Sequence, residues 1–158
     1  MHRVHATCVA LGDHGALLLG PSGSGKSDLA LRLIDAGALL VADDQVALLV
    51  RDGRLVASPP PHLPSLLEVR GVGLVPLPRR AEVALSAAFS LRPGGHTERL
   101  PEPAIWRHTG VAIPLYTVDP EAASAAARVR LLVSTAPLAV EPEAWSPKAD
   151  TFDEPTGA

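Results

Sequence analysis

The sequence predicts an α/β domain in which short strands outnumber helices. Two observations support this prediction. The motif Gly20–Ser27 matches G-x-x-x-x-G-K-[ST] and stands between an apolar run at Ala16–Leu19 and a helical pattern at 28–36. Strand, loop and helix in this order are typical of a phosphate-binding P-loop. Short apolar runs separated by turn residues then recur along the chain, which indicates strands joined as hairpins.

The elements around this loop follow from local sequence patterns. His5–Leu11 and Ala16–Leu19 flank Gly12–Gly15, a tight-turn composition, and form a predicted antiparallel hairpin. This hairpin places a second strand directly before the P-loop strand. In the predicted helix over 28–36 the apolar residues share one face, and Gly37 is the expected residue just after the helix.

Strands also dominate the rest of the chain. The prolines in 58–64 cannot continue a strand ladder, so this segment is predicted to be a rigid loop. The last residues are rich in proline and acidic side chains without periodicity, so we expect one domain over 1–140 and a disordered tail over 141–158. The other predicted elements are strands at 39–41, 46–50, 55–57, 73–77, 83–91 and 129–133, a surface loop at 92–103, an ambiguous segment at 104–116 and a short helix at 120–127.

The composition limits the classes of protein to consider. The chain has 158 residues, 47% of them hydrophobic and 3% aromatic, so its core must be built from Leu, Val and Ala. The net charge of −3 gives no support for binding to nucleic acid or to an anionic membrane. The apolar runs are too short to span a membrane, and we expect a cytoplasmic protein. The single cysteine, Cys8, is predicted to be a buried small hydrophobe.

The P-loop carries the clearest functional signal. Its glycines allow backbone N–H groups to turn toward phosphate oxygens, and the following helix N-terminus adds partial positive charge. Lys26, one of only two lysines in the chain, can reach the β- and γ-phosphates, and the Ser27 hydroxyl can ligate Mg²⁺. We therefore predict binding of a nucleoside triphosphate or a similar polyphosphate, rather than a simple turn before a helix. The predicted nucleotide-binding residues are Gly20, Pro21, Ser22, Gly23, Ser24, Gly25, Lys26 and Ser27.

Two adjacent carboxylates offer the chemistry that a phosphate-binding loop lacks. Asp43 and Asp44 follow the strand at 39–41, where the carboxyl end of a strand faces bound phosphates. One carboxylate can hold Mg²⁺ while the other accepts a proton from an attacking hydroxyl. The alternative is a solvated turn, in which Asp pairs are common. The neighbouring P-loop favours the functional interpretation.

Three further residues are weaker candidates when each is taken alone. Glu68 precedes Val69–Gly73, whose two glycines suggest unusual φ angles or close approach of a ligand. His5 opens a strand, where a lone histidine is usually structural or exposed. Arg99 stands in the Gly-rich loop, where it can clamp a phosphate, although most loop arginines are solvated.

Taken together, these motifs resemble the catalytic domain of HPr kinase/phosphorylase, a P-loop enzyme that modifies a serine of the phosphocarrier protein HPr. The chain looks closest to the short, single-domain alphaproteobacterial form, over His5 to about Tyr116. Four features carry the resemblance: His5 fifteen residues before Gly20, the P-loop, Leu40–Asp44, and Leu67–Gly73, which is similar to the family's E-[IV]-R-G-[LV]-G signature. It implies a P-loop kinase domain with a mixed, largely antiparallel sheet, similar to phosphoenolpyruvate carboxykinase, and a possible hexamer.

The resemblance also implies a role for each candidate residue. Asp44 corresponds to the aspartate that takes the serine proton, and His5 to the histidine that contacts it. Arg99 corresponds to a loop arginine that contacts the transferring phosphate. The residues that correspond to the surroundings of the metal ions are Ser27, Asp43 and Glu68. The implied cofactors are ATP and Mg²⁺, and the implied partner is an HPr-like phosphocarrier of a phosphotransferase system.

One departure from the family pattern bears on the direction of the reaction. The long members of the family carry a Pro-Gly-Arg-Asn type signature in their C-terminal region that is involved in docking HPr and in phosphorolysis, whereas Thr117–Ala122 contains no arginine. We therefore expect serine kinase activity with weak or absent phosphorolysis. Two alternatives stay open: a P-loop kinase or NTPase that acts on a small molecule, and a non-catalytic regulator that senses nucleotides.

Overall fold

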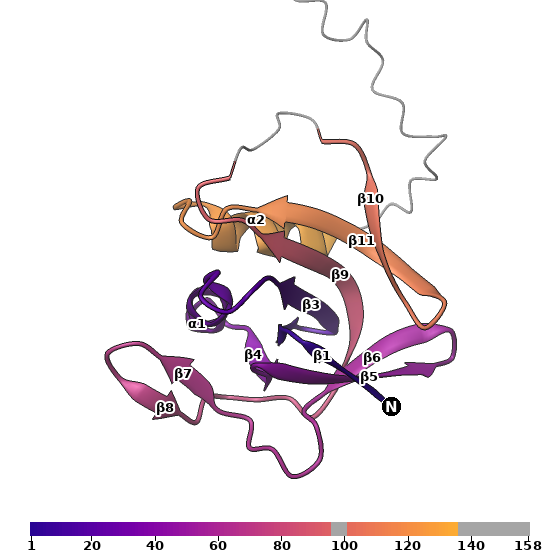
Figure 1. Cartoon of the computed structure of the whole chain (residues 1–158), viewed down its shortest axis with the longest axis horizontal. Helices are drawn as coiled ribbons and strands as arrows, with labels where there is room; N and C mark the ends of the chain where they lie inside the picture. Colours follow the sequence, from indigo (N-terminus) through magenta and orange to yellow (C-terminus); the bar gives the residue numbers. More distant parts are fainter. Residues whose placement is uncertain (96–100, 136–158) are drawn as a thin grey trace, which may run out of the picture.

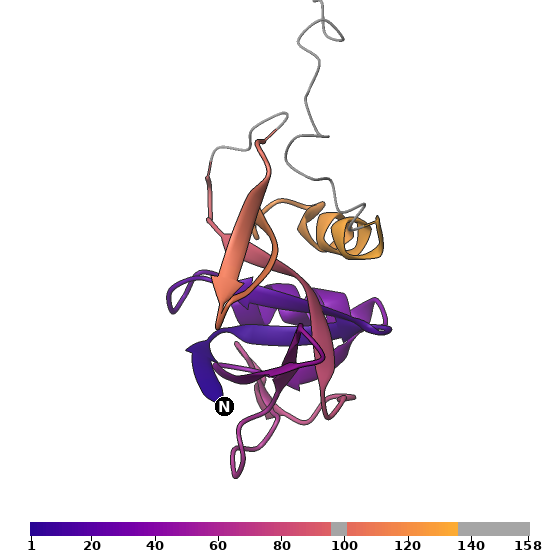
Figure 2. The same ribbon diagram turned by 90° about the vertical axis from the view of Figure 1, so that its right-hand side faces the viewer.

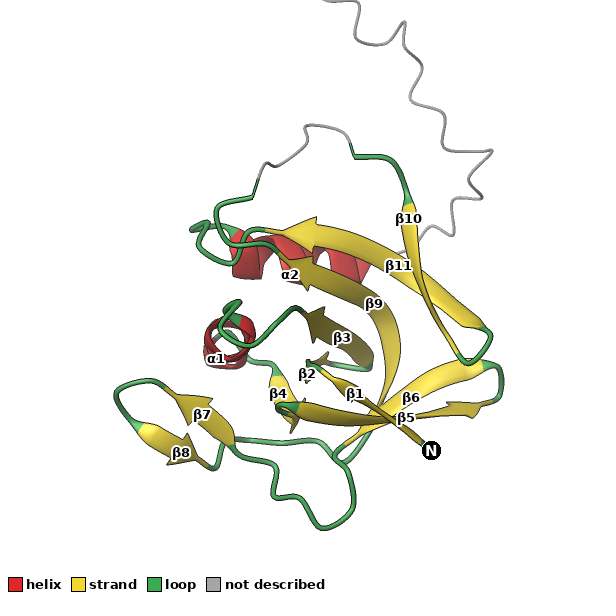
Figure 3. Ribbon diagram, viewed as in Figure 1, coloured by secondary structure: helices red, strands yellow, loops and turns green. Residues whose placement is uncertain are grey.

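The computed structural model of the chain describes residues 1–95 and 101–135. Two helices lie among many strands in this part of the chain (Figure 3). The elements in chain order are β1 (His2–His5), β2 (Thr7–Leu11), β3 (His14–Leu19), α1 (Lys26–Asp35), β4 (Leu39–Ala42), β5 (Gln45–Arg51), β6 (Arg54–Ser58), β7 (Leu67–Val69), β8 (Gly73–Val75), β9 (Val83–Leu91), β10 (Ala104–His108), β11 (Val111–Val118) and α2 (Ala125–Thr135).

Nine of these strands form one mixed sheet with β9 as its junction. The main path is β1-β5-β6-β9-β3-β2-β4, and the β10–β11 hairpin joins through a pairing of β11 with β9. The start of β9 pairs antiparallel with β6, and the rest of it pairs in parallel with β3 and β11. Figure 1 shows β9 curving away from the β5–β6 hairpin and then running between β3 and β11. The predicted α/β fold with a mixed, largely antiparallel sheet is confirmed.

The sheet is buried on both faces around β3 and β9. Leu18 and Phe89 belong to a core cluster with α1 and α2, whereas Leu17 and Ala88 belong to a second cluster with β5 and β6. Successive strand residues point to opposite faces, so a strand buried on both sides reads as a continuous apolar run. The view in Figure 2 shows α2 to one side of the sheet. Cys8 is fully buried in the second cluster, as predicted, and burial raises the pKa of its thiol.

Most of the locally predicted elements are present. The β2–β3 and β5–β6 hairpins, the helix after the P-loop, β4 and β9 occupy the expected segments. Of the predicted loop at 58–64, Ser58 ends β6, and the remaining residues lie in the loop that leads to β7. The Gly37 N–H donates to the Ile34 carbonyl at 2.9 Å just after α1, as expected of a residue at this position. The ambiguous segment at 104–116 contains β10 and most of β11.

The prediction for the C-terminal elements was wrong in two places. The expected strand at 129–133 is part of α2, and the expected helix at 120–127 begins only at Ala125. The buried residues Ala125, Val129 and Val133 follow at intervals of four, so they line one face of a helix against the core. The predicted tail from residue 141 lies outside the described residues. No described helix has the length and apolar run needed to cross a membrane.

Candidate active site

The P-loop connects β3 to α1 in a closely packed turn. A Cβ placed on Gly20 would overlap the Ser24 hydroxyl oxygen, so only glycine fits there. Gly25 has a φ of 100°, which favours glycine, and its Cα faces the ring of Pro120. The Ser24 Oγ is buried and makes no hydrogen bond to the described residues. The loop therefore carries a polar atom that its own fold leaves unsatisfied.

Lys26 is buried, although a lysine at the end of a glycine-rich loop would ordinarily be exposed to solvent. Only 7% of its surface is accessible, and its Nζ donates to the carbonyls of Gly20 at 2.6 Å and Pro21 at 2.9 Å. Partial burial lowers the pKa of the Lys26 ammonium, whereas the nearby Asp43 and Asp44 act in the opposite direction. The lysine thus lies folded against its own loop, close to both carboxylates.

Asp43 ties four elements of the site together. Its carboxylate accepts hydrogen bonds from the Ser27 hydroxyl at 3.1 and 3.2 Å and from the Thr7 hydroxyl at 2.7 Å. The backbone N–H of Glu68 donates to the same carboxylate at 3.5 Å. Asp43 follows β4 directly, so β2, α1, β4 and β7 converge on this one side chain.

Asp44 has different surroundings from its neighbour. Its side chain is 75% exposed, and its Oδ1 lies 3.3 Å from Nδ1 of His5. Its backbone has a left-handed φ of 69°, a conformation that aspartate tolerates better than most residues but that still costs roughly 1 kcal/mol. The turn directs one carboxylate to Ser27 and the next one to His5. Strain of this kind concentrates at functional sites.

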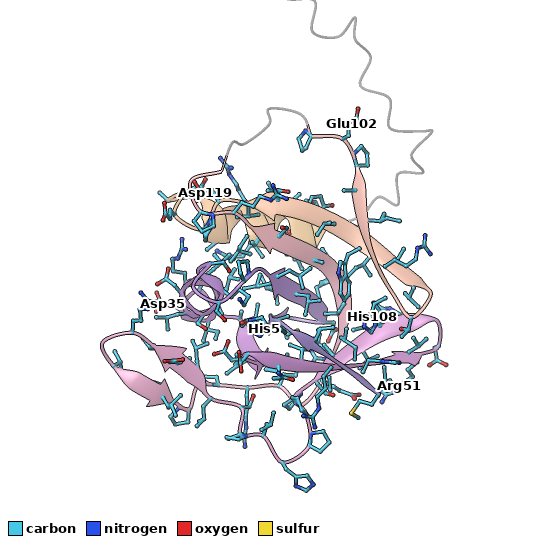
Figure 4. All side chains as sticks on the ribbon, viewed as in Figure 1. His5, Asp35, Arg51, Glu102, His108 and Asp119 are labelled. Carbon is cyan, nitrogen blue, oxygen red and sulfur yellow. The ribbon has the colours of Figure 1, made fainter. Side chains whose placement is uncertain are left out.

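The remaining predicted residues are placed only in part. Glu68 is exposed on β7, and of its atoms the backbone N–H contacts Asp43. The predicted unusual conformation of the following glycines is confirmed, with φ of 81° at Gly71 and 116° at Gly73. Arg99 lies outside the described residues. Figure 4 shows His5 near the middle of the molecule, at the end of β1.

Comparison with known proteins identifies the family to which the segment that carries this site belongs. The model of a family described as the HPr serine kinase C-terminal domain matches residues 1–80, which contain β1 to β8, the P-loop, His5, Asp43, Asp44 and Glu68. The chain belongs to this family.

Relatives in the HPr kinase family match this chain over part of their length. The HPr kinase/phosphorylase of Clostridium tetani is 43% identical over 76 residues, which are 48% of this chain and 25% of that protein. The enzyme of the same name from Clostridium botulinum is 42% identical over 73 residues, 46% of this chain and 24% of the relative. The chain thus matches about a quarter of the length of these relatives.

A solved structure extends the likeness in fold. The HPr(Ser) kinase/phosphatase from Coxiella burnetii superposes with a TM-score of 0.73 and 22% sequence identity. The match covers 85% of this chain and 95% of that structure. The shared fold therefore continues beyond residue 80, where the match to the family model ends.

The oxygen ligands that Ser27 and Asp43 offer at this site fit an Mg²⁺ ion that is also bound to phosphate. Among the described residues no three His, Cys, Asp or Glu side chains cluster as a metal cage. Mg²⁺ is usually held by one or two carboxylates together with substrate phosphates and water. The paired Ser27 hydroxyl and Asp43 carboxylate match that requirement.

Sequence reasoning missed two contributors to the site. Thr7 is fully buried and donates to Asp43, and its signal was present as a hydroxyl within an otherwise apolar strand. Pro120 packs on Gly25 from a segment nearly one hundred residues away. No local pattern marks such a contact.

Proposed function

We propose that this chain is an ATP- and Mg²⁺-dependent protein serine kinase that phosphorylates an HPr-like phosphocarrier protein and so regulates a phosphotransferase system in the cytoplasm. One observation carries the proposal. The Ser27 hydroxyl of the P-loop donates a hydrogen bond to Asp43, and the next residue, Asp44, contacts His5. The proposal therefore gives metal binding to Asp43 and acceptance of the proton to the adjacent Asp44. Membership of the HPr kinase family and the names of its relatives support the choice of substrate.

Nucleotide binding falls to the P-loop in this proposal. Its backbone N–H groups and Lys26 hold the β- and γ-phosphates of ATP. Ser27, Asp43 and Glu68 would hold Mg²⁺, which when bound offsets the negative charge of the phosphates. Because Asp43 is fixed by Thr7, its carboxylate needs little rearrangement to serve there.

Asp44 is the proposed general base. It is exposed, so the hydroxyl of a serine on another protein can reach it. The serine oxygen forms a bond to the γ-phosphorus, the bond between that phosphorus and the oxygen of ADP breaks, and the serine proton goes to Asp44. His5 is proposed to orient the Asp44 carboxylate through the contact at 3.3 Å. The role of Arg99 on the transferring phosphate stays a prediction from the resemblance.

We propose that the reverse reaction, phosphorolysis, is weak or absent. The segment 117–122 supplies no arginine to bind phosphoserine and inorganic phosphate. It supplies Asp119 and Glu121 instead, whose charges would oppose a second anion if their side chains face the site. The relation to phosphoenolpyruvate carboxykinase, the hexamer, and the division into a catalytic domain over 1–140 and a tail over 141–158 also stay predictions.

A direct test is to incubate the protein with Mg-ATP and HPr and to locate the phosphate by mass spectrometry. Phosphate on a single serine of HPr, lost when that serine is replaced by alanine, supports the proposal. Phosphorylated metabolites with unmodified HPr would favour a small-molecule kinase, and ATP binding without turnover a nucleotide-sensing regulator.

For the reverse reaction, serine-phosphorylated HPr is supplied with inorganic phosphate and Mg²⁺. Pyrophosphate release at a rate comparable to the kinase reaction would contradict the predicted loss of phosphorolysis.

A further inference from the structure

The turn at 119–122, between β11 and α2, packs on the P-loop from outside the segment that the family model matches. Pro120 in this turn is buried, and a Cβ built on Gly25 would lie 3.1 Å from its Cβ and 3.2 Å from its Cγ. Gly25 directly precedes α1. The proline ring therefore covers the backbone at the residue where the P-loop becomes a helix.

Arg32 on α1 holds this turn in place. Its Nη2 donates to the carbonyl oxygen of Pro120, and its Nη1 donates to that of Ala122 at 3.5 Å. The same Nη2 lies 3.2 Å from the Asp28 carboxylate. A planar guanidinium with five N–H donors can make all these contacts at once, which an ammonium cannot. The helix that begins at Lys26 is thus bonded to the turn that covers Gly25.

Asp119 fixes the other side of the same turn. Its Oδ1 accepts a hydrogen bond from the Glu121 N–H at 2.9 Å and another from the Gly94 N–H at 3.2 Å. Figure 4 shows Asp119 beside the start of α2, on the side of the molecule where α1 lies. Because the turn is bonded on both sides, the proline ring cannot leave the P-loop without breaking several hydrogen bonds.

We propose that Arg32 and Pro120 form a wedge that positions the P-loop for nucleotide binding, with Arg32 as a positioning residue. A glycine-rich loop loses much conformational freedom when its N–H groups gather around phosphates, and a loop already held in place loses less on binding. The inference rests on the proposed function in one respect, that the P-loop binds ATP. A merely structural contact would stabilise the fold and leave the affinity for ATP unchanged.

The test measures Mg-ATP binding to the full chain by calorimetry, together with KM and kcat for ATP. Arg32→Gln is expected to weaken binding and raise KM about tenfold, the effect of one lost charge-assisted hydrogen-bond group, while kcat at saturating ATP stays near wild type. Arg32→Lys retains the positive charge but not the planar pair of donor nitrogens, so we expect a loss of ATP affinity between those of wild type and Arg32→Gln. Arg128→Gln removes an exposed arginine from α2 and serves as the matched control, with wild-type affinity.

Pro120→Ala gives a second route to the same answer, because it shortens the wedge and removes no hydrogen-bond donor. It serves also if Arg32→Gln fails to fold. If the two residues act through one contact, the double variant loses less affinity than the sum of the single losses. Folded variants that bind Mg-ATP as tightly as wild type, or fully additive losses, overturn the wedge alone. A wild-type protein that binds no Mg-ATP overturns the proposed function as well.

Discussion

Residues 1–80 and residues 81–135 contribute to this molecule in different ways. The first region contains the P-loop and both adjacent aspartates, and it is the part that the family model matches. The second region supplies β9, β11 and α2, which complete the sheet and its core. Structural likeness to the Coxiella burnetii protein nevertheless covers 85% of the chain, so it extends into the second region.

The two regions differ because the residues of the candidate site and the residues of the core meet different requirements. A phosphate-binding lysine or a carboxylate that accepts a proton has no substitute of another chemical type at its position. A core position such as Phe89 requires only apolar volume of about the right shape, which several residues provide. A fold can therefore persist where the sequence signature has ended. The following predictions test this division, from the largest expected effect to the smallest.

The largest effect is expected in the second region, on stability. Phe89 is fully buried on β9 in the cluster that packs against α1 and α2, 5.6 Å from the ring of Tyr116. Phe89→Ala should lower the free energy of unfolding by about 3–5 kcal/mol, since it removes a large side chain and leaves a cavity. Denaturant titration measures the loss, and Phe89→Leu should cost clearly less. A loss below about 1 kcal/mol would mean that β9 is not the centre of the core.

The next effect is expected in the first region, on rate alone. Asp44→Asn keeps size and hydrogen bonding but cannot take the serine proton, so turnover should fall about 10²-fold or more with ATP affinity little changed. Asp52→Asn is the matched control, because Asp52 is also exposed and also has a left-handed φ, of 53°. Near-wild-type turnover of Asp44→Asn would remove Asp44 from the mechanism.

Loss of the P-loop lysine should act on binding. Lys26→Ala removes the ammonium that we propose to bind the phosphates, and we expect Mg-ATP affinity to fall about 10- to 100-fold. The two hydrogen bonds to Gly20 and Pro21 disappear as well, so a small loss of thermal stability should accompany it. Arg54→Ala, at the exposed turn end of the β5–β6 hairpin, controls for loss of one positive charge. Unchanged nucleotide binding by calorimetry would refute the P-loop assignment.

The smallest effect is expected at His108 on β10, in the second region. Burial and the neighbouring His2 ring, 5.5 Å away, lower the pKa of His108. The unfolded chain then binds this proton more readily than the folded one, so His108 destabilises the fold as pH falls below the ordinary value near 6.5. His108→Gln should flatten the dependence of Tm on pH between 7.5 and 5.5, without changing turnover. Equal slopes for both proteins would contradict this assignment.

The sequence alone determined the elements whose signals are local. The P-loop, the helix after it, the two hairpins and β4 follow from motif and periodicity within a few residues, and the structure contains all of them. The placement of Asp43 and Asp44 at the end of β4, near the loop, followed from the same local reasoning. Contact between His5 and Asp44 required the added resemblance to the family, because a lone histidine carries no signal.

Only the tertiary structure decided the features that depend on distant residues. The segment at 129–133 became helix because its valines at intervals of four meet a core built by other strands. Lys26 is buried against its own loop, where it donates hydrogen bonds to the carbonyls of Gly20 and Pro21. Asp43 is held by a hydrogen bond from Thr7 on another strand. Pro120 reaches Gly25 across nearly one hundred residues. The local sequence pattern indicates which secondary structure a segment prefers. Its burial and its hydrogen-bond partners depend on which other segments pack against it.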